Sequence, residues 1–220
     1  MARMGMIIDL NRCITCMACT IACLRENVMR QTGDAVELPE GNSTYYARTK
    51  PAKMTMEGYP FSGVTYFIQC LHCENAPCAM ACPTGATYIT ENGVVMLDHN
   101  KCIGCRACVI ACPYGARTMY RGKIGGPAPH SEALLPGYPD KCTFCIHRGS
   151  ASSNNWVPAC VEACAFGARM FGDLDDPASE VSRIVRSGKA VTLAPELGTR
   201  PKLFFIPPQR TPAVSRTGRK

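Results

Sequence analysis

The sequence predicts an α+β fold that consists of two pseudo-symmetric units with long loops inserted into them. Three observations lead to this prediction. Sixteen cysteines fall into four groups of four, with none left over. The stretch that follows the last cysteine recurs from group to group, and short segments of strand length lie between the groups. Internal repeats of this kind indicate that one supersecondary unit is used several times.

The cysteine groups share their first and last spacings. Every group begins with C-x2-C and ends with C-x3-C, whereas the middle spacing is two residues in groups one and three, four in group two and fourteen in group four. Groups two, three and four continue into the similar segments 82–86, 112–116 and 164–168. In group order, the cysteines are Cys13, Cys16, Cys19 and Cys23; Cys70, Cys73, Cys78 and Cys82; Cys102, Cys105, Cys108 and Cys112; and Cys142, Cys145, Cys160 and Cys164.

Strand signals lie before, between and after the groups. Residues 86–90, 91–93 and 94–97 have the pattern of a strand, an Asn-Gly turn and a second strand. They predict a β-hairpin that leads from group two to group three. Residues 5–10 and 203–206 are two further predicted strands.

A helix is predicted after group four. Residues 176–177 combine an aspartate with a proline, which suits the first helical position, and Gly188 is suited to end the helix. Val181, Ile184 and Val185 give this helix one apolar face.

Three stretches interrupt the repeats, namely residues 26–63, 121–139 and 148–158. They are rich in Gly, Pro, Ser or other polar residues, and we expect all three to be surface loops. Long loops of this kind serve docking or are merely tolerated. Residues 207–220 are expected to form a loose or partner-bound tail.

The cysteine spacing suits a cubane iron–sulfur cluster. A [4Fe–4S] cluster has four irons, each of which needs one thiolate. Cysteines two residues apart wrap a tight loop around three of its corners, and the fourth cysteine ligates the other cluster in two-cluster ferredoxins. Pro83 and Pro113 follow the fourth cysteine, as in that ferredoxin run. The groups therefore predict four [4Fe–4S] clusters in ferredoxin-like units.

Other uses of the cysteines fit less well. Structural zinc prefers two separated pairs of ligands, often with histidine. Disulfides, as in small secreted scaffolds, do not explain four matching copies. Zinc or a three-iron cluster in group four alone remains an open alternative.

Cross-ligation pairs groups two and three, because the hairpin joins them, and groups one and four then pair with each other. Pairing one with two and three with four is the alternative, which leaves the hairpin without a role. The expected ligand sets are cluster A with Cys13, Cys16, Cys19 and Cys164; cluster B with Cys23, Cys142, Cys145 and Cys160; cluster C with Cys70, Cys73, Cys78 and Cys112; and cluster D with Cys82, Cys102, Cys105 and Cys108.

The expected domains follow from this pairing. Residues 64–120 form one ferredoxin-like unit around groups two and three. Residues 1–63 together with 121–206 form the second unit around groups one and four, with its inserted loops. Residues 207–220 are the tail.

The formal net charge is +7, and basic residues concentrate after residue 200. A basic tail is compatible with nucleic acid or an anionic membrane surface. This one lacks the interleaved aromatic residues of single-strand binding, and thiolate-ligated clusters are themselves anionic. We expect no nucleic-acid partner. The sequence has no run of about eighteen apolar residues, so we expect no membrane span of its own, and it shows no secretory or twin-arginine signal.

The remaining candidates have mostly ordinary explanations. His72 and His147 lie beside cysteines and either tune a cluster through hydrogen bonds or have no specific role. Arg106 and Arg148 are candidates for balancing cluster charge. Trp156 serves either packing or docking. No acid/base pair, nucleophile elbow, phosphate loop or dinucleotide fingerprint is present, so no catalytic residue is expected.

The chain resembles the four-cluster, ferredoxin-like iron–sulfur B subunits of the dimethyl sulfoxide reductase family, especially those of polysulfide, thiosulfate and arsenate reductases. The resemblance covers about residues 5–207. The segments that carry it are residues 6–9, 69–78, 141–145, 171–177 and 198–203.

The resemblance implies an electron-transfer subunit that is not catalytic alone. A separate subunit with a molybdenum or tungsten bis-pterin cofactor would perform the chemistry of anaerobic respiration, and a quinone-interacting membrane subunit or another redox partner would complete the relay. It also implies the cross-ligation given above. The compartment would be the cytoplasm, or the periplasm by co-export with the catalytic subunit. The main alternative is a free polyferredoxin or a ferredoxin-like subunit of a hydrogenase complex.

Overall fold

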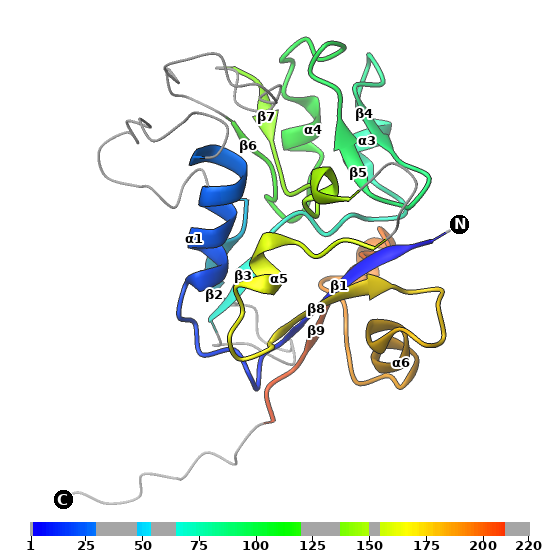
Figure 1. Cartoon of the computed structure of the whole chain (residues 1–220). Helices are drawn as coiled ribbons and strands as arrows, with labels where there is room; N and C mark the ends of the chain where they lie inside the picture. Colours follow the sequence, from blue (N-terminus) through cyan, green and yellow to red (C-terminus); the bar gives the residue numbers. More distant parts are fainter. Residues whose placement is uncertain (1, 30–47, 54–64, 120–136, 150–154, 210–220) are drawn as a thin grey trace, which may run out of the picture.

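The computed structural model describes residues 2–29, 48–53, 65–119, 137–149 and 155–209. These residues form a mixed arrangement of short helices and strands, as the α+β prediction requires (Figure 1). Four small sheets are present in this part of the chain, and only the central one has three strands. Within the described residues, no helix is long and apolar enough to cross a membrane.

The central sheet has the strand order β8-β1-β9. Strand β1 (Met4–Asp9) pairs antiparallel with β8 (Arg169–Asp173) and parallel with β9 (Leu203–Ile206). The N-terminal strand is therefore held between two strands from the C-terminal part of the chain (Figure 1). The strands expected at residues 5–10 and 203–206 are confirmed.

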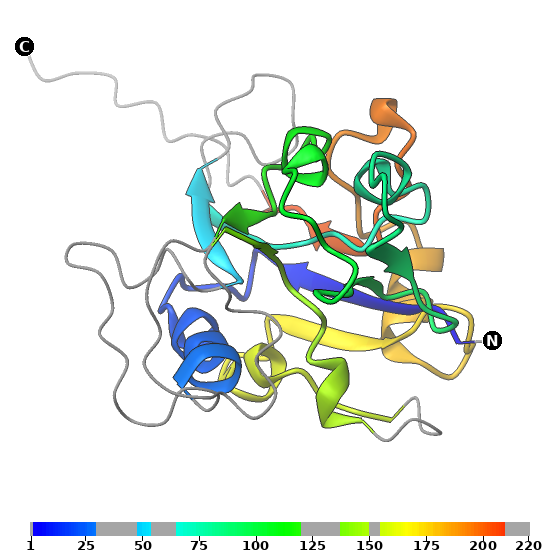
Figure 2. The same cartoon turned by 90° about the horizontal axis from the view of Figure 1, so that it is seen from above.

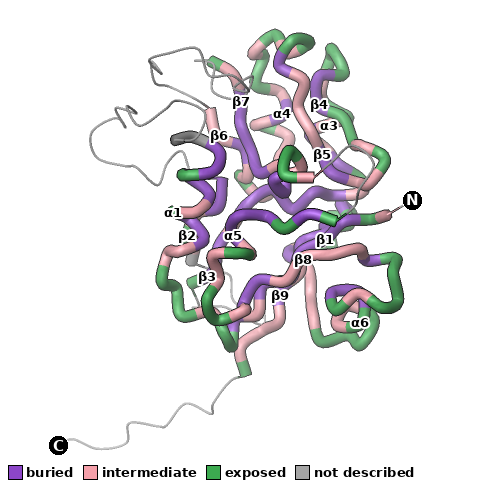
Figure 3. Tube along the Cα trace, in the orientation of Figure 1, coloured by how far each residue is buried: buried purple, intermediate pink, exposed green. Residues whose placement is uncertain are grey.

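The two faces of β1 contribute to two different cores. Met4, Met6 and Ile8 point into the large core that also contains many of the cysteines. Ile7 points the opposite way and packs with Leu174 and Val181 under helix α6. This alternation follows from the period of two along a strand. Because both faces are covered, β1 is buried along its length (Figure 3).

Three two-stranded antiparallel sheets accompany the central sheet in the described part of the chain. The predicted hairpin between groups two and three is confirmed, and the turn residue Gly93 has a φ of +77°. Such a φ favours glycine, as expected for an Asn-Gly turn. The three sheets pair β2 (Lys50–Lys53) with β3 (Thr65–Ile68), β4 (Thr87–Ile89) with β5 (Val95–Leu97), and β6 (Thr118–Met119) with β7 (Pro139–Asp140).

Four short helices pack in two pairs. Helix α1 (Ala18–Leu24), which continues as a π-helical turn (Arg25–Met29), packs against α5 (Ala159–Glu162). Helix α3 (Pro77–Met80) packs against α4 (Ala107–Ile110). The pairs lie in different parts of the molecule (Figures 1 and 2). Two 3-10 turns, Ile146–Arg148 and Pro195–Leu197, are also present.

Helix α6 (Glu180–Arg186) begins later than predicted. The Asp176 side chain accepts a hydrogen bond from the Ala178 amide at 2.8 Å, and its carbonyl accepts one from the Ser179 amide at 3.1 Å. These bonds hold Pro177 in a turn before the helix, so the proline is not the first helical residue. The predicted end at Gly188 is confirmed, because its amide bonds to the Val185 carbonyl and its φ is +74°.

The prediction of surface loops is partly wrong. In the first predicted loop, Asn27 and Thr49 are buried and residues 50–53 form β2. In the third, Trp156 is 6% exposed. Asn27 and Thr49 line the cavity beside the cysteines, and Trp156 belongs to the large core. These core contacts outweigh the local loop-like composition. Residues 30–47, 54–64, 120–136, 150–154 and 210–220 lie outside the described residues, so most of the second predicted loop and of the tail do too.

Replacing Leu203 by Ala should destabilise the protein by about 2–5 kcal/mol, because the side chain is fully buried in β9. The measurement is the urea midpoint of the anoxically purified protein, followed by circular dichroism. Leu197→Ala is the matched control, since Leu197 is 50% exposed and such a surface change is expected within about 0.5 kcal/mol. Equal midpoints for the two variants would contradict the assignment of β9 to the core.

Candidate metal centres

The third cysteine of every group sits on one of the four short helices. Cys19, Cys78, Cys108 and Cys160 lie in α1, α3, α4 and α5, and all four are buried. The preceding cysteines lie on loops. Ahead of α1 and α4 the chain passes through the left-handed region at Met17 (φ 66°) and Arg106 (φ 65°). The loop therefore turns sharply just before the helix that carries the third cysteine.

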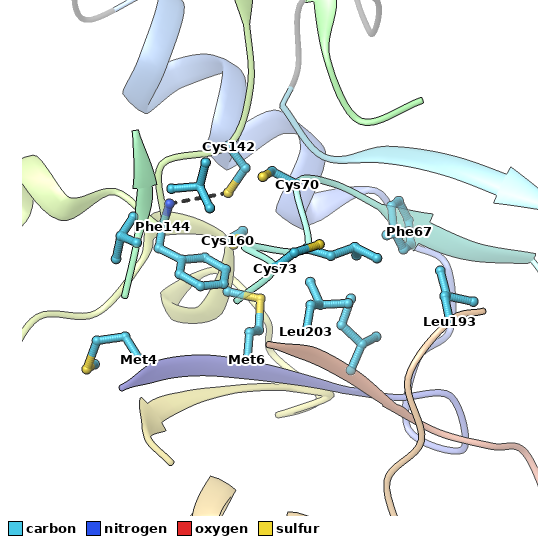
Figure 4. Packing of buried hydrophobic residues seen from close by; sticks show 14 of the residues in the cluster. Met4, Met6, Phe67, Cys70, Cys73, Cys142, Phe144, Cys160, Leu193 and Leu203 are labelled. Atoms are coloured by element: carbon cyan, nitrogen blue, oxygen red, sulfur yellow. Dashed lines mark hydrogen bonds between the residues drawn. The ribbon is translucent and has the colours of Figure 1, made fainter. Parts of the chain in front are cut away.

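Thiols from groups four and one are close neighbours in the interior. The pKa of the Cys142 thiol is raised well above its usual value. Burial is the largest cause, and the negative charges of the neighbouring thiolates of Cys160, Cys145 and Cys23 add to it. Burial and the neighbouring thiols also raise the pKa of Cys23 to about 12. The four side chains line one cavity. Figure 4 shows the Cys142 sulfur beside the Phe144 amide, among the buried residues of this core.

Thiols from groups two and three are also neighbours. The pKa of Cys73 is raised to about 12. Burial is the largest cause, the Cys70 thiol is the next that raises it, and the Cys78 and Cys112 thiols add smaller contributions. Burial is also the main cause of the raised pKa of Cys108; Arg117 opposes it, and the thiols of Cys78, Cys102 and Cys82 add to it in that order. In the other set of groups, burial and then Cys19 and Cys164 raise the pKa of Cys13.

The structure thus brings thiols of group one next to group four, and thiols of group two next to group three. Cys16 and Cys105 are exposed. The other fourteen cysteines are buried or half-buried. The helix pairs α1 with α5 and α3 with α4 are the elements that join the groups.

The arrangement suits a cluster better than a single ion. In the part of the chain that the structure describes, no group of three or more His, Cys, Asp or Glu side chains is placed to hold one metal ion. A tetrahedral zinc site needs four ligands at about 2.0–2.3 Å from one centre. A cubane instead takes one thiolate at each of four irons, so its ligands stand farther apart around a larger space, such as the cavity between Cys23, Cys142, Cys145 and Cys160.

Hydrogen-bond donors point at several sulfurs. Gln69 Nε2 lies 3.6 Å from Cys142 Sγ, Asn27 Nδ2 lies 3.6 Å from Cys23 Sγ, and an Arg169 guanidinium nitrogen lies 3.7 Å from Cys160 Sγ. Backbone amides also donate, from Phe144 to Cys142 at 3.3 Å and from Thr87 to Cys82 at 3.4 Å. Such bonds stabilise thiolate charge and tune cluster potentials.

A buried ion pair supports the same region. Arg48 Nε donates to Asp140 Oδ2 at 2.8 Å, and Arg48 also donates to Asn27 Oδ1 at 2.8 Å. Burial, the largest influence, acts to lower the pKa of Arg48, but the carboxylate and the nearby thiolates together raise it. The pair thereby fixes Asn27, which in turn donates to the Cys23 sulfur.

The isolated candidates from the sequence have structural roles. His72 is fully buried, stacks on Phe144 with ring centroids 3.8 Å apart, and accepts a hydrogen bond from the Val95 amide at Nδ1. His147 Nε2 lies 2.9 Å from a Glu26 carboxylate oxygen. Trp156 donates to the Phe144 carbonyl at 2.8 Å and packs on Phe171, which assigns it to packing.

The two arginine candidates are also placed. Arg148 pairs with Glu162 at 2.8 Å and with Glu26 at 3.3 Å, so carboxylates already balance its charge. Arg106 is exposed at the start of α4.

Several functional side chains were missed in the sequence. Arg48 and Gln69 reach the cysteine-lined cavity only through the tertiary fold, and no local pattern marks them. Asn27 lies four residues after Cys23 on the same helical stretch, so the i,i+4 spacing of a helix could have marked it. Arg117 and Arg169 had a signal: each ends a Gly-Ala-Arg segment, five residues after the fourth cysteine of its group. The similar segments 112–116 and 164–168 continue by one residue into these two arginines.

Buried thiols gathered around short helices, with donors aimed at their sulfurs, define an iron–sulfur protein of the ferredoxin type. Comparison with known families agrees. Residues 61–124 match a 4Fe-4S dicluster domain, residues 101–168 match a second 4Fe-4S dicluster domain family, and residues 10–27 match a 4Fe-4S binding domain.

Relatives narrow this class. The protein is 37% identical to the B subunit of the sulfite dehydrogenase of Allochromatium vinosum, over 96% of this protein and 85% of the relative. It is 36% identical to the iron–sulfur subunit of the arsenate respiratory reductase of Shewanella sp., over 93% and 96%. It is 35% identical to the corresponding B polypeptide of the polysulfide reductase of Wolinella succinogenes, over 94% and 95%.

The chain therefore belongs to the iron–sulfur B subunits of the dimethyl sulfoxide reductase family of oxidoreductases. It holds [4Fe–4S] clusters, transfers electrons within a reductase-type complex, and is not catalytic alone. The resemblance suggested by the sequence is confirmed. The identities to sulfite, arsenate and polysulfide enzymes are nearly equal, so they do not select a substrate.

Replacing Trp156 by Ala should lower the urea concentration at which the visible cluster absorbance is lost, because a large aromatic truncation in a core costs about 3–5 kcal/mol. Trp156→Phe keeps an aromatic ring and removes the hydrogen bond to Phe144, which is worth about 1 kcal/mol. We expect an intermediate midpoint for it. Identical midpoints for the wild type and Trp156→Ala would show that this packing does not support the cysteines around it.

Proposed function

We propose that this chain relays single electrons through four [4Fe–4S] clusters between a molybdenum or tungsten bis-pterin catalytic subunit and a quinone-linked membrane subunit or other redox partner. The observation that carries the proposal is the grouping of thiols from distant segments, above all the four that line one interior cavity. The clusters supply reversible one-electron chemistry when bound. The chain holds them, fixes their spacing and excludes water.

The proposed ligand sets are those expected from the repeat, one thiolate for each iron. Electrostatic contacts among the thiols support them. The sets are A with Cys13, Cys16, Cys19 and Cys164; B with Cys23, Cys142, Cys145 and Cys160; C with Cys70, Cys73, Cys78 and Cys112; and D with Cys82, Cys102, Cys105 and Cys108.

The helix pairs support two pseudo-symmetric two-cluster units. One unit would comprise residues 64–120 around α3 and α4. The other would comprise residues 1–63 and 121–206 around α1 and α5, with residues 207–220 as the tail. Each unit would use the fourth cysteine of one group to complete the cluster of the other.

The burial of the four ligand sets supports an order of the clusters along the relay, with two sets in the middle and two at the ends. All four cysteines of set B are buried, as are three of set C. Sets A and D each contain one exposed cysteine, Cys16 and Cys105. In this arrangement A and D are the ends at which electrons enter and leave, and B and C form the insulated middle. Exposed Ile14 and Ile103 stand beside the two ends.

Partner and compartment are proposed from the family. The relatives are subunits of sulfite, arsenate and polysulfide enzymes, so a separate catalytic subunit is expected here as well. We propose that the chain works in the cytoplasm, or in the periplasm after co-export with that subunit. It would reach a membrane only through its partner.

The first test is elemental analysis of the protein purified anoxically from its own cell with all bound partners. About sixteen irons per chain are expected from four cubanes, together with molybdenum or tungsten. Iron without either metal, in a preparation that still contains a large partner subunit, would rule out the bis-pterin partner. Abundant zinc with little iron would rule out the clusters.

Replacing Cys108 by Ser should remove about four irons per chain, the content of one cubane, and block electron flow through the complex. The measurements are iron content and turnover with the native electron donor. Ile110→Ser on the same helix is the matched control, because Ile110 is 84% exposed and carries no ligand atom. Unchanged iron and turnover in the Cys108 variant would defeat the assignment.

A further inference from the structure

The interior holds an excess of positive charge. The buried cationic side chains among the described residues are Arg48, Arg117, Lys141, Arg169 and Lys202, whereas the buried carboxylates are Glu26 and Asp140. Burying a charge without a partner is costly. An excess of this kind is stable only next to compensating negative charge, and thiolate-ligated clusters supply it.

Three of these cations have no carboxylate partner in the described part of the chain. Asp140 forms an ion pair with Arg48, and the Glu74 carboxylate is the charged group that acts most strongly on Lys202. Arg117, Lys141 and Arg169 take part in none of the ion pairs of the described residues. The negative charge that compensates these three cations therefore has to come from the cysteines beside them.

Arg169 lies between sets A and B. One of its guanidinium nitrogens is 3.7 Å from Cys160 Sγ of set B. Cys19, the third cysteine of set A, is its next strongest thiol neighbour. Gln69 and Thr49 hold the guanidinium at 2.8 Å and 2.9 Å, so its charge is fixed in place.

Lys141 lies between sets B and C. Its ammonium donates to the Cys142 carbonyl at 2.9 Å and to the Val95 carbonyl, and the residue is 3% exposed. The thiols nearest to it electrostatically are Cys70 and Cys78 of set C and Cys142 of set B.

Arg117 lies between sets C and D. Its thiol neighbours are Cys78 and Cys70 of set C and Cys108 of set D. Although it is only 5% exposed, none of its three guanidinium nitrogens has an oxygen or nitrogen acceptor in the described part of the chain. A buried guanidinium whose donor hydrogens lack such acceptors fits a sulfur-rich anionic group beside it.

We propose that Arg169, Lys141 and Arg117 are fixed positive charges, one at each of the three junctions of the four-cluster relay, and that each raises the reduction potentials of the two clusters it separates. The inference rests on the ligand sets proposed above. Adding an electron makes a cluster more anionic, so a fixed cation nearby stabilises the reduced form. Net charge, hydrogen bonds and burial are known to set cluster potentials.

The repeat supports a shared role for the two arginines. Arg117 and Arg169 occupy the same place, five residues after the fourth cysteine, in groups three and four. Group two has Thr87 at this place. Each proposed two-cluster unit thus contains one such arginine between its own clusters, and Lys141 lies where the units meet.

Arg117 gives the cleanest test, because among the described residues it bonds to no oxygen or nitrogen acceptor that its loss would leave unpaired. Arg117→Gln removes the charge and keeps a donor, while Arg117→Lys keeps the charge. Arg183→Gln is the matched control, since it removes one exposed charge on α6, under the opposite face of β1. The measurement is a redox titration of the intact complex followed by electron paramagnetic resonance, with iron content determined on the same samples.

With iron content unchanged, Arg117→Gln should lower the midpoint potentials of two clusters by about 59 mV, which corresponds to a tenfold smaller equilibrium constant for their one-electron reduction. Arg117→Lys and Arg183→Gln should leave them near the wild-type values. Unmoved midpoints at full iron content would overturn this inference and leave the proposed function standing. Wild-type iron far below about sixteen per chain would instead overturn the proposed function.

If Arg117→Gln fails to retain its iron, Lys141→Gln provides the same test at the middle junction. The expected result is a lower midpoint for two of the four clusters, with the other two near their wild-type values. Shifts spread equally over all four clusters, or no shift at full iron content, would contradict a local effect and overturn the inference.

Discussion

Negative charge on sulfur in a protein interior has to be compensated, and the rest of this structure depends on that requirement. Nine of the sixteen cysteines are buried, and burial raises the pKa of those such as Cys23, Cys73 and Cys142. Free thiolates would be unstable there. Iron binding, amide and side-chain donors, and buried cations together make the thiolate form tolerable.

Much of the core consists of sulfur-containing side chains. The large apolar cluster that packs on β1 includes Cys70, Cys73 and Cys142 together with Met6, Leu203 and Phe67 (Figure 4). Side chains that would be aliphatic in an ordinary domain are the proposed cluster ligands here. Folding and cluster binding are therefore expected to be coupled, because the same cysteine side chains belong to the core and to the proposed ligand sets.

Local signals predicted the local structure. The hairpin of β4 and β5, the strands β1 and β9, and the end of α6 at Gly188 all follow from turn chemistry and periodicity. The start of α6 was placed too early, because Pro177 is held in a turn by Asp176. Gln69 could not be predicted as a sulfur donor, since it meets Cys142 only through the tertiary fold. Burial likewise overrode the polar composition around Thr49 and Trp156.

The place of β1 has a consequence for how the protein is made. Met6 pairs with Leu203, so the N-terminal strand gains its parallel neighbour only after about 200 further residues have been synthesised. At about 5–20 residues per second this takes roughly 10–40 s. During that interval the apolar strand and the first cysteines have no native partners from the C-terminal part. The central sheet can therefore form only after residues 169–206 have been made.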